Sequence, residues 1–193
     1  MSRGLLIIVA LVLIFSFFGC STYNGMVQKD TNVQEKWANV QTQYQRRADL
    51  IPNLVRTVQG VANFEKSTLQ SVIEARANAT SIRLNADQLT PENVARFQQA
   101  QEQLGGSLSR LLAVAENYPQ LRATQNFSEL QAQLEGTENR IAVARNDFNT
   151  AVRDYNQSVR TFPNNIFAGM FGFNVRGFFE ASAAAQQAPT VQF

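Results

Sequence analysis

Residues that could carry out chemistry are few and widely separated in this chain. The sequence contains no histidine and a single cysteine, Cys20. Histidine is the commonest general base and metal ligand, and a serine or cysteine nucleophile ordinarily needs it as a partner. No glycine-rich string of the kind that cradles phosphate occurs either. We therefore predict no catalytic residue, no metal ligand and no cofactor. A carboxylate-dependent hydrolase is the one enzymatic alternative that the composition leaves open.

Cys20 is the first candidate site, because it ends an apolar run near the N-terminus. The run extends from Leu5 to Phe18, contains only Ser16 as a polar residue, and is preceded by Arg3. A Gly-Cys pair after such a run is similar to the lipid-attachment signal of bacterial lipoproteins. A helix continued to Tyr23 would instead approach the roughly 20 residues that span a bilayer. A cleaved secretory signal has the same shape. The first two alternatives both tether the protein to a membrane.

A second candidate site consists of Arg46, Arg47, Asp49 and Asn53, which surround a proline. Exposed N–H groups at a helix start and arginine forks could together bind an anion or an acidic partner. The structural alternative, which we favour, is that Asp49 caps a second helix and an arginine fixes the turn through an ion pair.

A third candidate site lies in the apolar segment from Ile166 to Phe179. Exposed apolar patches of this size usually mark interaction surfaces. We expect this segment to contact the membrane or a neighbouring subunit, unless it packs on its own bundle. The candidate residues are Phe167, Met170, Phe171, Phe173, Phe178 and Phe179.

Apolar residues recur at steps of three and four along most of the chain, which is the pattern of amphipathic helices. We therefore expect helices to position these candidate sites. The first stripe comprises Val33, Trp37, Val40, Tyr44 and Ile51, and it continues as Leu54, Val58 and Val61. Because proline disrupts a helix interior, we predict that one helix ends near Asp49 and another begins at Pro52; a single kinked helix is the alternative.

Later helix boundaries are signalled by capping residues and prolines. Thr90, Pro91 and Glu92 form a typical helix start. Ser128, with glutamine three residues later, predicts a capping box, and Pro163 predicts the end of the last long helix.

The expected fold is all-α: an up-and-down antiparallel four-helix bundle preceded by one N-terminal membrane segment. The expected organisation has four parts. Residues 1–23 form a transmembrane helix or lipoprotein signal, residues 24–162 the bundle, residues 163–180 an apolar segment rich in aromatic residues and glycine, and residues 181–193 a flexible tail.

The charge distribution argues against nucleic acid as a partner. The chain has 17 basic and 15 acidic residues and a net charge of +2. These residues are scattered singly, whereas a nucleic-acid-binding protein gathers Lys and Arg on one stripe. No sequence feature indicates a small-molecule substrate.

Several strings give the chain a specific resemblance to the LemA family. They are Tyr23-Asn24-Gly25-Met26-Val27, Trp37-Ala38-Asn39-Val40-Gln41, and Arg46-Arg47-Ala48-Asp49-Leu50-Ile51-Pro52-Asn53-Leu54-Val55, with Phe162-Pro163 and Phe179-Glu180 near the end. The resemblance implies a bacterial membrane protein with one N-terminal segment and a four-helix bundle. It implies no catalytic site.

Three functional hypotheses follow. The favoured one is a non-enzymatic scaffold of the bacterial envelope that associates with the membrane and with protein partners or itself. A membrane-remodelling or lipid-binding module that uses the Phe-rich segment is the first alternative, and the hydrolase is the second. The expected location is the bacterial cell membrane, with a single N-terminal anchor. The bundle is expected on the extracytoplasmic side, because Arg3 favours a cytoplasmic N-terminus.

Overall fold

The computed structural model describes residues 3–60 and 64–180. Residues 1–2, 61–63 and 181–193 lie outside this description, and so do the side chains of Arg3, Leu6, Leu11, Ile14 and Phe15. The predicted tail therefore lies outside the described residues. The elements are α1 (Arg3–Gln59), α2 (Lys66–Ser81), the 3₁₀ helix η1 (Ala86–Gln88), α3 (Pro91–Ala115), α4 (Pro119–Arg122), α5 (Gln125–Arg160) and α6 (Asn164–Phe171). Every regular element of the described residues is helical, which confirms the predicted all-α class.

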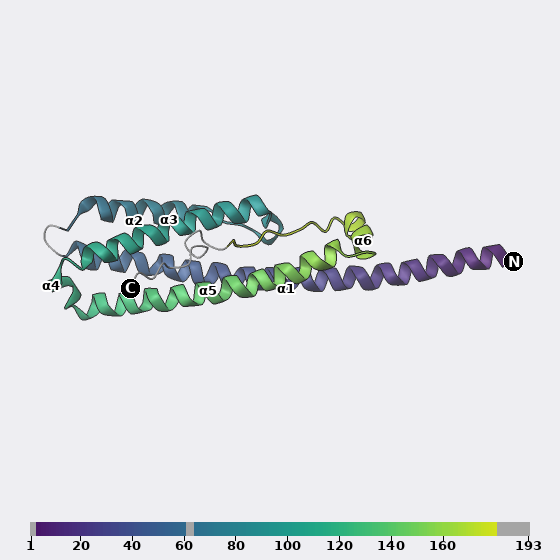
Figure 1. Cartoon of the computed structure of the whole chain (residues 1–193), viewed down its shortest axis with the longest axis horizontal. Coiled ribbons are helices and arrows are strands. Elements are labelled where there is room, and N and C mark those ends of the chain that lie inside the picture. The colour runs from purple at the N-terminus through teal and green to yellow at the C-terminus, as the bar shows by residue number, and fades with distance from the viewer. Residues whose placement is uncertain (1–2, 61–63, 181–193) are drawn as a thin grey trace, which may run out of the picture.

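The four long helices run alternately up and down along one elongated bundle (Figure 1). Helix α1 packs most extensively against α5, and α2 packs against α3. Because α2 and α3 are shorter than the other two, they cover only part of α1 (Figure 1). The N-terminal part of α1 extends beyond the bundle, and α6 lies at the end from which it leaves (Figure 1). We call this the proximal end.

The core lies where the apolar stripes predict it. Val33, Trp37, Val40, Tyr44 and Ile51 are all at most 5% exposed. The buried residues form two clusters, one built around Trp37 and Phe148 and the other around Leu54 and Leu111. Burial of these side chains is the main favourable contribution to folding.

The predicted break at Pro52 is wrong, because α1 continues through this residue without interruption. A proline has no N–H group, so the carbonyl four residues earlier, that of Ala48, loses its helical partner. Arg76 of α2 supplies the replacement: its Nε donates to the Ala48 carbonyl oxygen at 2.8 Å. This hydrogen bond offsets the cost of removing the carbonyl from water, so the helix can continue. The continuity expected under the alternative, a single helix through Pro52, is therefore confirmed.

The other predicted boundaries had mixed outcomes. The start of α3 is confirmed: Pro91 is its first residue, and the Thr90 hydroxyl accepts a hydrogen bond from the Asn93 N–H. The capping box at Ser128 is wrong, because α5 already begins at Gln125 and the Ser128 hydroxyl donates to the Thr124 carbonyl within its first turn. Helix α5 ends at Arg160, shortly before Pro163 as predicted.

The predicted boundary between residues 23 and 24 falls inside α1, so one continuous helix contains both sides of it. Several described apolar side chains on the protruding part are exposed, among them Ile7 at 62% and Phe17 at 77%. Within the part of the chain that the structure describes, no helix combines the length and the apolar character that a membrane crossing requires.

Candidate interaction surfaces

Helix α6 packs against the turn of α1 at which this helix leaves the bundle. Gly19 of α1 is buried, and a methyl group at this position would lie 3.1 Å from Cε1 of Phe167. One turn later, the Tyr23 ring contacts the rings of Phe171 and Phe173 edge to face, with centroids 5.0 and 5.7 Å apart. These contacts fix α6 at the proximal end.

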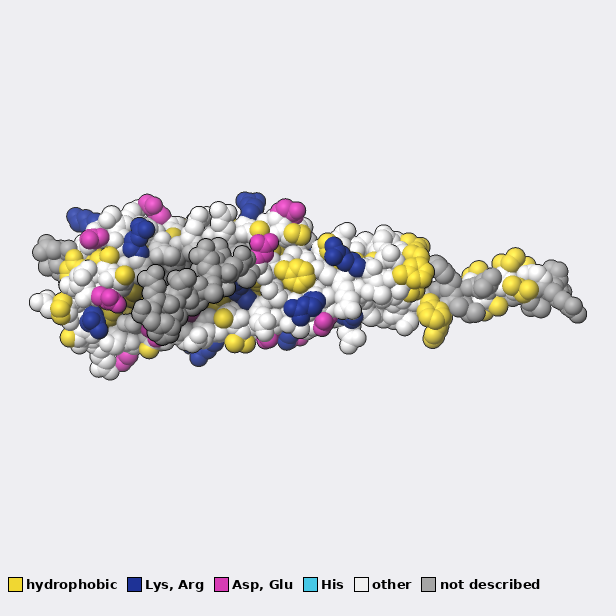
Figure 2. Space-filling view, viewed as in Figure 1, with side chains coloured by type: hydrophobic (Ala, Val, Ile, Leu, Met, Phe, Trp, Pro, Cys, Tyr) yellow, Lys and Arg dark blue, Asp and Glu magenta, His cyan; other side chains and the backbone are white. Residues whose placement is uncertain are grey.

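The six aromatic-segment candidates divide into buried and exposed residues. Phe167 and Phe179 are each 4% exposed, so they are core residues of this chain and are withdrawn as outer contacts. Phe173 is half-buried. Met170, Phe171 and Phe178 are 66%, 49% and 41% exposed and stay candidates. Figure 2 shows hydrophobic side chains gathered at the proximal end, where α6 lies.

Residues 172–180 form an extended strap that runs back from α6 along the bundle (Figure 1). Three side-chain amides hold its backbone, and each makes two hydrogen bonds to the N–H and C=O of a single strap residue. Asn156 pairs in this way with Arg176, Asn149 with Phe179, and Gln98 with Glu180, at distances between 2.8 and 3.1 Å. The amides thus satisfy backbone groups that would otherwise lose water on burial.

The strap side chains fasten it further. Phe179 inserts among the rings of Trp37, Phe97 and Phe148, with centroid distances of 5.5 to 6.3 Å. Arg176 forms an ion pair with Asp30 of α1, with Nη2 2.9 Å from Oδ1.

Gly177 lets the strap approach the start of α3 closely. A Cβ at position 177 would lie 2.8 Å from the Pro91 Cα, so only glycine fits without displacement. The Gly177 N–H donates to the Leu89 carbonyl oxygen at 2.9 Å.

The sequence analysis missed this strap and the amides that hold it. The available signal was weak: Asn149 and Asn156 lie on one helix seven residues apart, and therefore on one face. Nothing in that spacing shows that the face receives a backbone from residues 172–180.

The structure does not bring the four residues of the candidate site around Pro52 together. Arg47 is 3% exposed and points into the bundle, where Nη1 lies 2.7 Å from Oε1 of Glu138 on α5. Its Nη2 donates to the side-chain and backbone oxygens of Gln101 on α3, at 2.6 and 3.1 Å. The predicted ion pair therefore exists, but it connects α1 to α5 instead of fixing a turn. Arg47 is buried in this pair, whereas the Glu138 side chain is 50% exposed.

The other three residues of this candidate site, Arg46, Asp49 and Asn53, are exposed on the surface of α1. Asp49 is exposed in the middle of the helix and accepts a hydrogen bond from Gln45 at 2.7 Å, so its predicted role as a helix cap is wrong. Asn53 accepts a hydrogen bond from Arg56. Arg46 and Asp49 line a shallow surface groove. Arg46 and Arg47 therefore face different surroundings.

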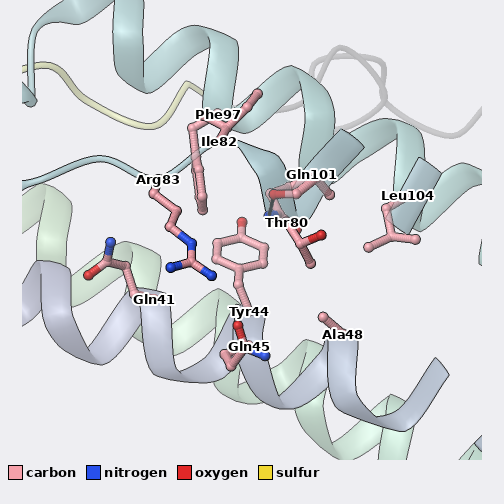
Figure 3. A pocket seen from close by; sticks show the side chains of 11 residues that line it. Gln41, Tyr44, Gln45, Ala48, Thr80, Ile82, Arg83, Phe97, Gln101 and Leu104 are labelled. Atoms are coloured by element: carbon pink, nitrogen blue, oxygen red, sulfur yellow. Dashed lines mark hydrogen bonds between the residues drawn. The ribbon is translucent and has the colours of Figure 1, made fainter. Parts of the chain in front are cut away.

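A cavity of about 80 Å³ lies between α1, α2 and α3, with Tyr44 at its centre (Figure 3). Arg83 reaches toward the Tyr44 ring from the loop after α2, and Phe97 points in from α3 (Figure 3). Burial raises the pKa of the Tyr44 phenol above its ordinary value of 10.0, against a smaller lowering by Arg145 and Arg47. Among the described residues that line this cavity there is no carboxylic acid.

Two further observations concern metal binding and lipid attachment. Among the described residues, no group of three or more acidic or cysteine side chains could hold a metal ion. Cys20 is an exposed free thiol on α1, beside Gly19.

Comparison with known proteins identifies relatives that match most of the chain. The chain is 27% identical over 179 residues to "Magnetosome protein MamQ 1" of Paramagnetospirillum magneticum, covering 84% of this chain and 66% of the relative. It therefore spans slightly less than two thirds of that relative's length. It is 21% identical over 169 residues to "Protein LemA" of Metamycoplasma hominis, covering 88% of this chain and 74% of the relative. The LemA family model matches residues 36–193. Since this match covers most of the chain, the protein belongs to the LemA family.

Proposed function

We propose that this protein is a membrane-anchored helical scaffold of the bacterial envelope and performs no catalysis. Its anchor is the segment of residues 1–23, and its bundle lies on the extracytoplasmic side. The observation that carries the proposal is the continuity of α1, which runs for 57 residues from the apolar segment into the bundle core. At 1.5 Å per residue this helix is about 85 Å long. A rigid rod of this kind holds an interaction surface at a fixed distance from its attachment.

The support for a membrane anchor comes from the amino-acid sequence. The run from Leu5 to Phe18 contains no charge, and the uncharged stretch continues to Gln28. The relatives carry names that assign no reaction to them. No observation favours a role in changing the shape of the membrane, and none favours the carboxylate-dependent hydrolase.

Fractionation of cells that express the full chain tests the anchor. We expect the protein in the membrane fraction after a carbonate wash. Replacing Ile8 and Val12 together with arginine should move it to the soluble fraction, because each charge at the centre of a span costs about 2.5 to 3.5 kcal/mol. Val143→Arg, on an exposed part of α5, is the matched control and should stay with the membrane. A wild-type protein in the soluble fraction would refute the anchor.

Metabolic labelling with palmitate distinguishes the two anchoring alternatives. If the chain is a lipoprotein, label enters the wild type and Cys20→Ser abolishes it. Absence of label from a membrane-bound protein assigns the anchor to a retained helix.

Chemical crosslinking in intact membranes tests the scaffold role. We expect adducts heavier than the monomer through the bundle surface, either with itself or with other envelope proteins. A chain that stays monomeric and free of adducts at native expression would contradict the proposal.

A further inference from the structure

Two segments without charge, far apart in the sequence, meet at the proximal end of the bundle. Residues 4–28 contain no Asp, Glu, Lys or Arg, and neither do residues 161–175. The first segment lies on α1, and the second contains α6. Charged residues resume immediately beyond both, at Lys29, Arg160 and Arg176. This end of the molecule is therefore the part that a low-dielectric surrounding would accept most easily.

Helix α6 carries apolar residues on its outer face as well as on its inner one. Phe167 and Ala168 are buried against the bundle. Ile166, Met170 and Phe171 are 48%, 66% and 49% exposed. A surface helix of a protein surrounded only by water normally places polar residues on that outer face. Apart from Asn165, which is exposed in the first turn, the outer face of α6 thus lacks the side chains that water favours.

The contacts of α6 with α1 fix its depth relative to the proposed anchor. A helix from Leu5 to Tyr23 is about 28 Å long at 1.5 Å per residue, close to the roughly 30 Å of a bilayer core. Gly19, which contacts Phe167, would then lie about 6 Å inside the level of Tyr23. This is the boundary between acyl chains and headgroups, where aromatic rings such as that of Tyr23 are favoured.

The lipoprotein alternative leads to the same depth. Cleavage before Cys20 would remove residues 1–19 and make Cys20 the first residue of the mature chain. The acyl chains attached to Cys20 would then enter the bilayer at this point of the molecule. Tyr23, which contacts Phe171, follows within one helical turn. Either way of anchoring therefore holds α6 at the lipid surface.

We propose that α6 lies in the interfacial layer of the membrane, with Ile166, Met170 and Phe171 inserted among lipid acyl chains. The partner of this surface is the lipid bilayer. This inference rests on the proposed anchoring and deepens it, because it adds a second membrane contact made by the C-terminal part of the bundle. Insertion of a helix face by about 5 to 10 Å is typical of interfacial helices.

Fluorescence quenching in vesicles tests this placement with the full chain. The wild type contains one tryptophan, Trp37, which is 2% exposed in the bundle. Met170→Trp adds a second tryptophan on the outer face of α6, and Ile166→Trp is a second variant at the same surface. Val143→Trp is the matched control, because Val143 is an equally exposed apolar residue, 63% exposed, on α5. Each protein is reconstituted into phosphatidylcholine–phosphatidylglycerol vesicles with and without bromine on the upper acyl carbons.

We expect the variants at 170 and 166 to float with the vesicles and to lose emission in brominated vesicles, with a blue-shifted maximum. The wild type and Val143→Trp should float equally and lose no emission. Flotation without quenching at 170 and 166 would overturn this inference and leave the anchor standing. A blue shift without quenching, together with a dimer on size exclusion, would assign the surface to a second copy and also overturn it. Failure to float would overturn both the inference and the anchor.

Discussion

The contact between Arg76 and Ala48 allows a sharp test of why α1 continues through Pro52. In Arg76→Met the apolar stem stays and the donor to the Ala48 carbonyl is removed. Ala48 is 2% exposed, so water cannot easily replace the lost donor. A hydrogen bond from a charged group contributes about 1.5 to 3 kcal/mol, and we expect a loss of about 2 kcal/mol in the free energy of unfolding.

The same substitution should cost much less once residue 52 has an N–H. In Pro52→Ala, the amide of residue 52 can donate to the Ala48 carbonyl four residues earlier. Arg76→Met in this background should then cost about 0.5 kcal/mol, which gives a coupling energy of about 1.5 kcal/mol between the two sites. Pro52→Ala alone should stabilise the protein, because a proline inside a helix is unfavourable.

Urea unfolding of the full chain in detergent micelles, followed by circular dichroism, measures these differences. Arg96→Met is the matched control, since Arg96 is an exposed arginine on α3, and it should change stability by less than about 0.5 kcal/mol. Arg76→Lys should recover part of the loss, because lysine retains a donor. An equal cost of Arg76→Met with proline and with alanine at position 52 would refute this reasoning.

Two further predictions concern the strap and the cavity. Phe179→Ala should lower the free energy of unfolding by about 3 to 5 kcal/mol in the same assay, because it empties a site between three rings, whereas the exposed neighbour in Phe178→Ala should cost less than about 1 kcal/mol. Equal effects would place the strap outside the core. Because burial raises the pKa of Tyr44 in the folded state, its stabilising contribution is complete below the unfolded value of 10.0 and is lost as pH rises through the folded value. Tyr44→Phe should therefore lose less stability than the wild type as the pH rises above 10, and parallel pH profiles would contradict this sign.

Much of the fold follows from local sequence patterns. The steps of three and four place Val33, Trp37 and Val40 on one face, and the structure buries that face. Thr90 and Pro91 predict the start of α3, because capping depends on residues within one turn of each other. Family membership could also be predicted, since the strings that carry it are continuous in the sequence.

The candidate sites were less predictable, because their surroundings are assembled from distant segments. Arg46 and Arg47 are adjacent and chemically identical, yet one is exposed and the other is paired with Glu138 on α5. Their difference follows from the 100° between successive residues of a helix, together with the position of α5, which no local pattern contains.

The sequence by itself determined the helical class, the apolar faces, the lack of histidine chemistry and the uncharged N-terminal run. Only the tertiary structure decided that α1 passes through Pro52, that Phe179 belongs to the core, and that α6 contacts the turn at Gly19. The physical reason is the same in each case. A polar or apolar group needs a partner to replace water, and here that partner comes from a segment far away in the chain: Arg76 for the Ala48 carbonyl, and the ring cluster of Trp37 for Phe179.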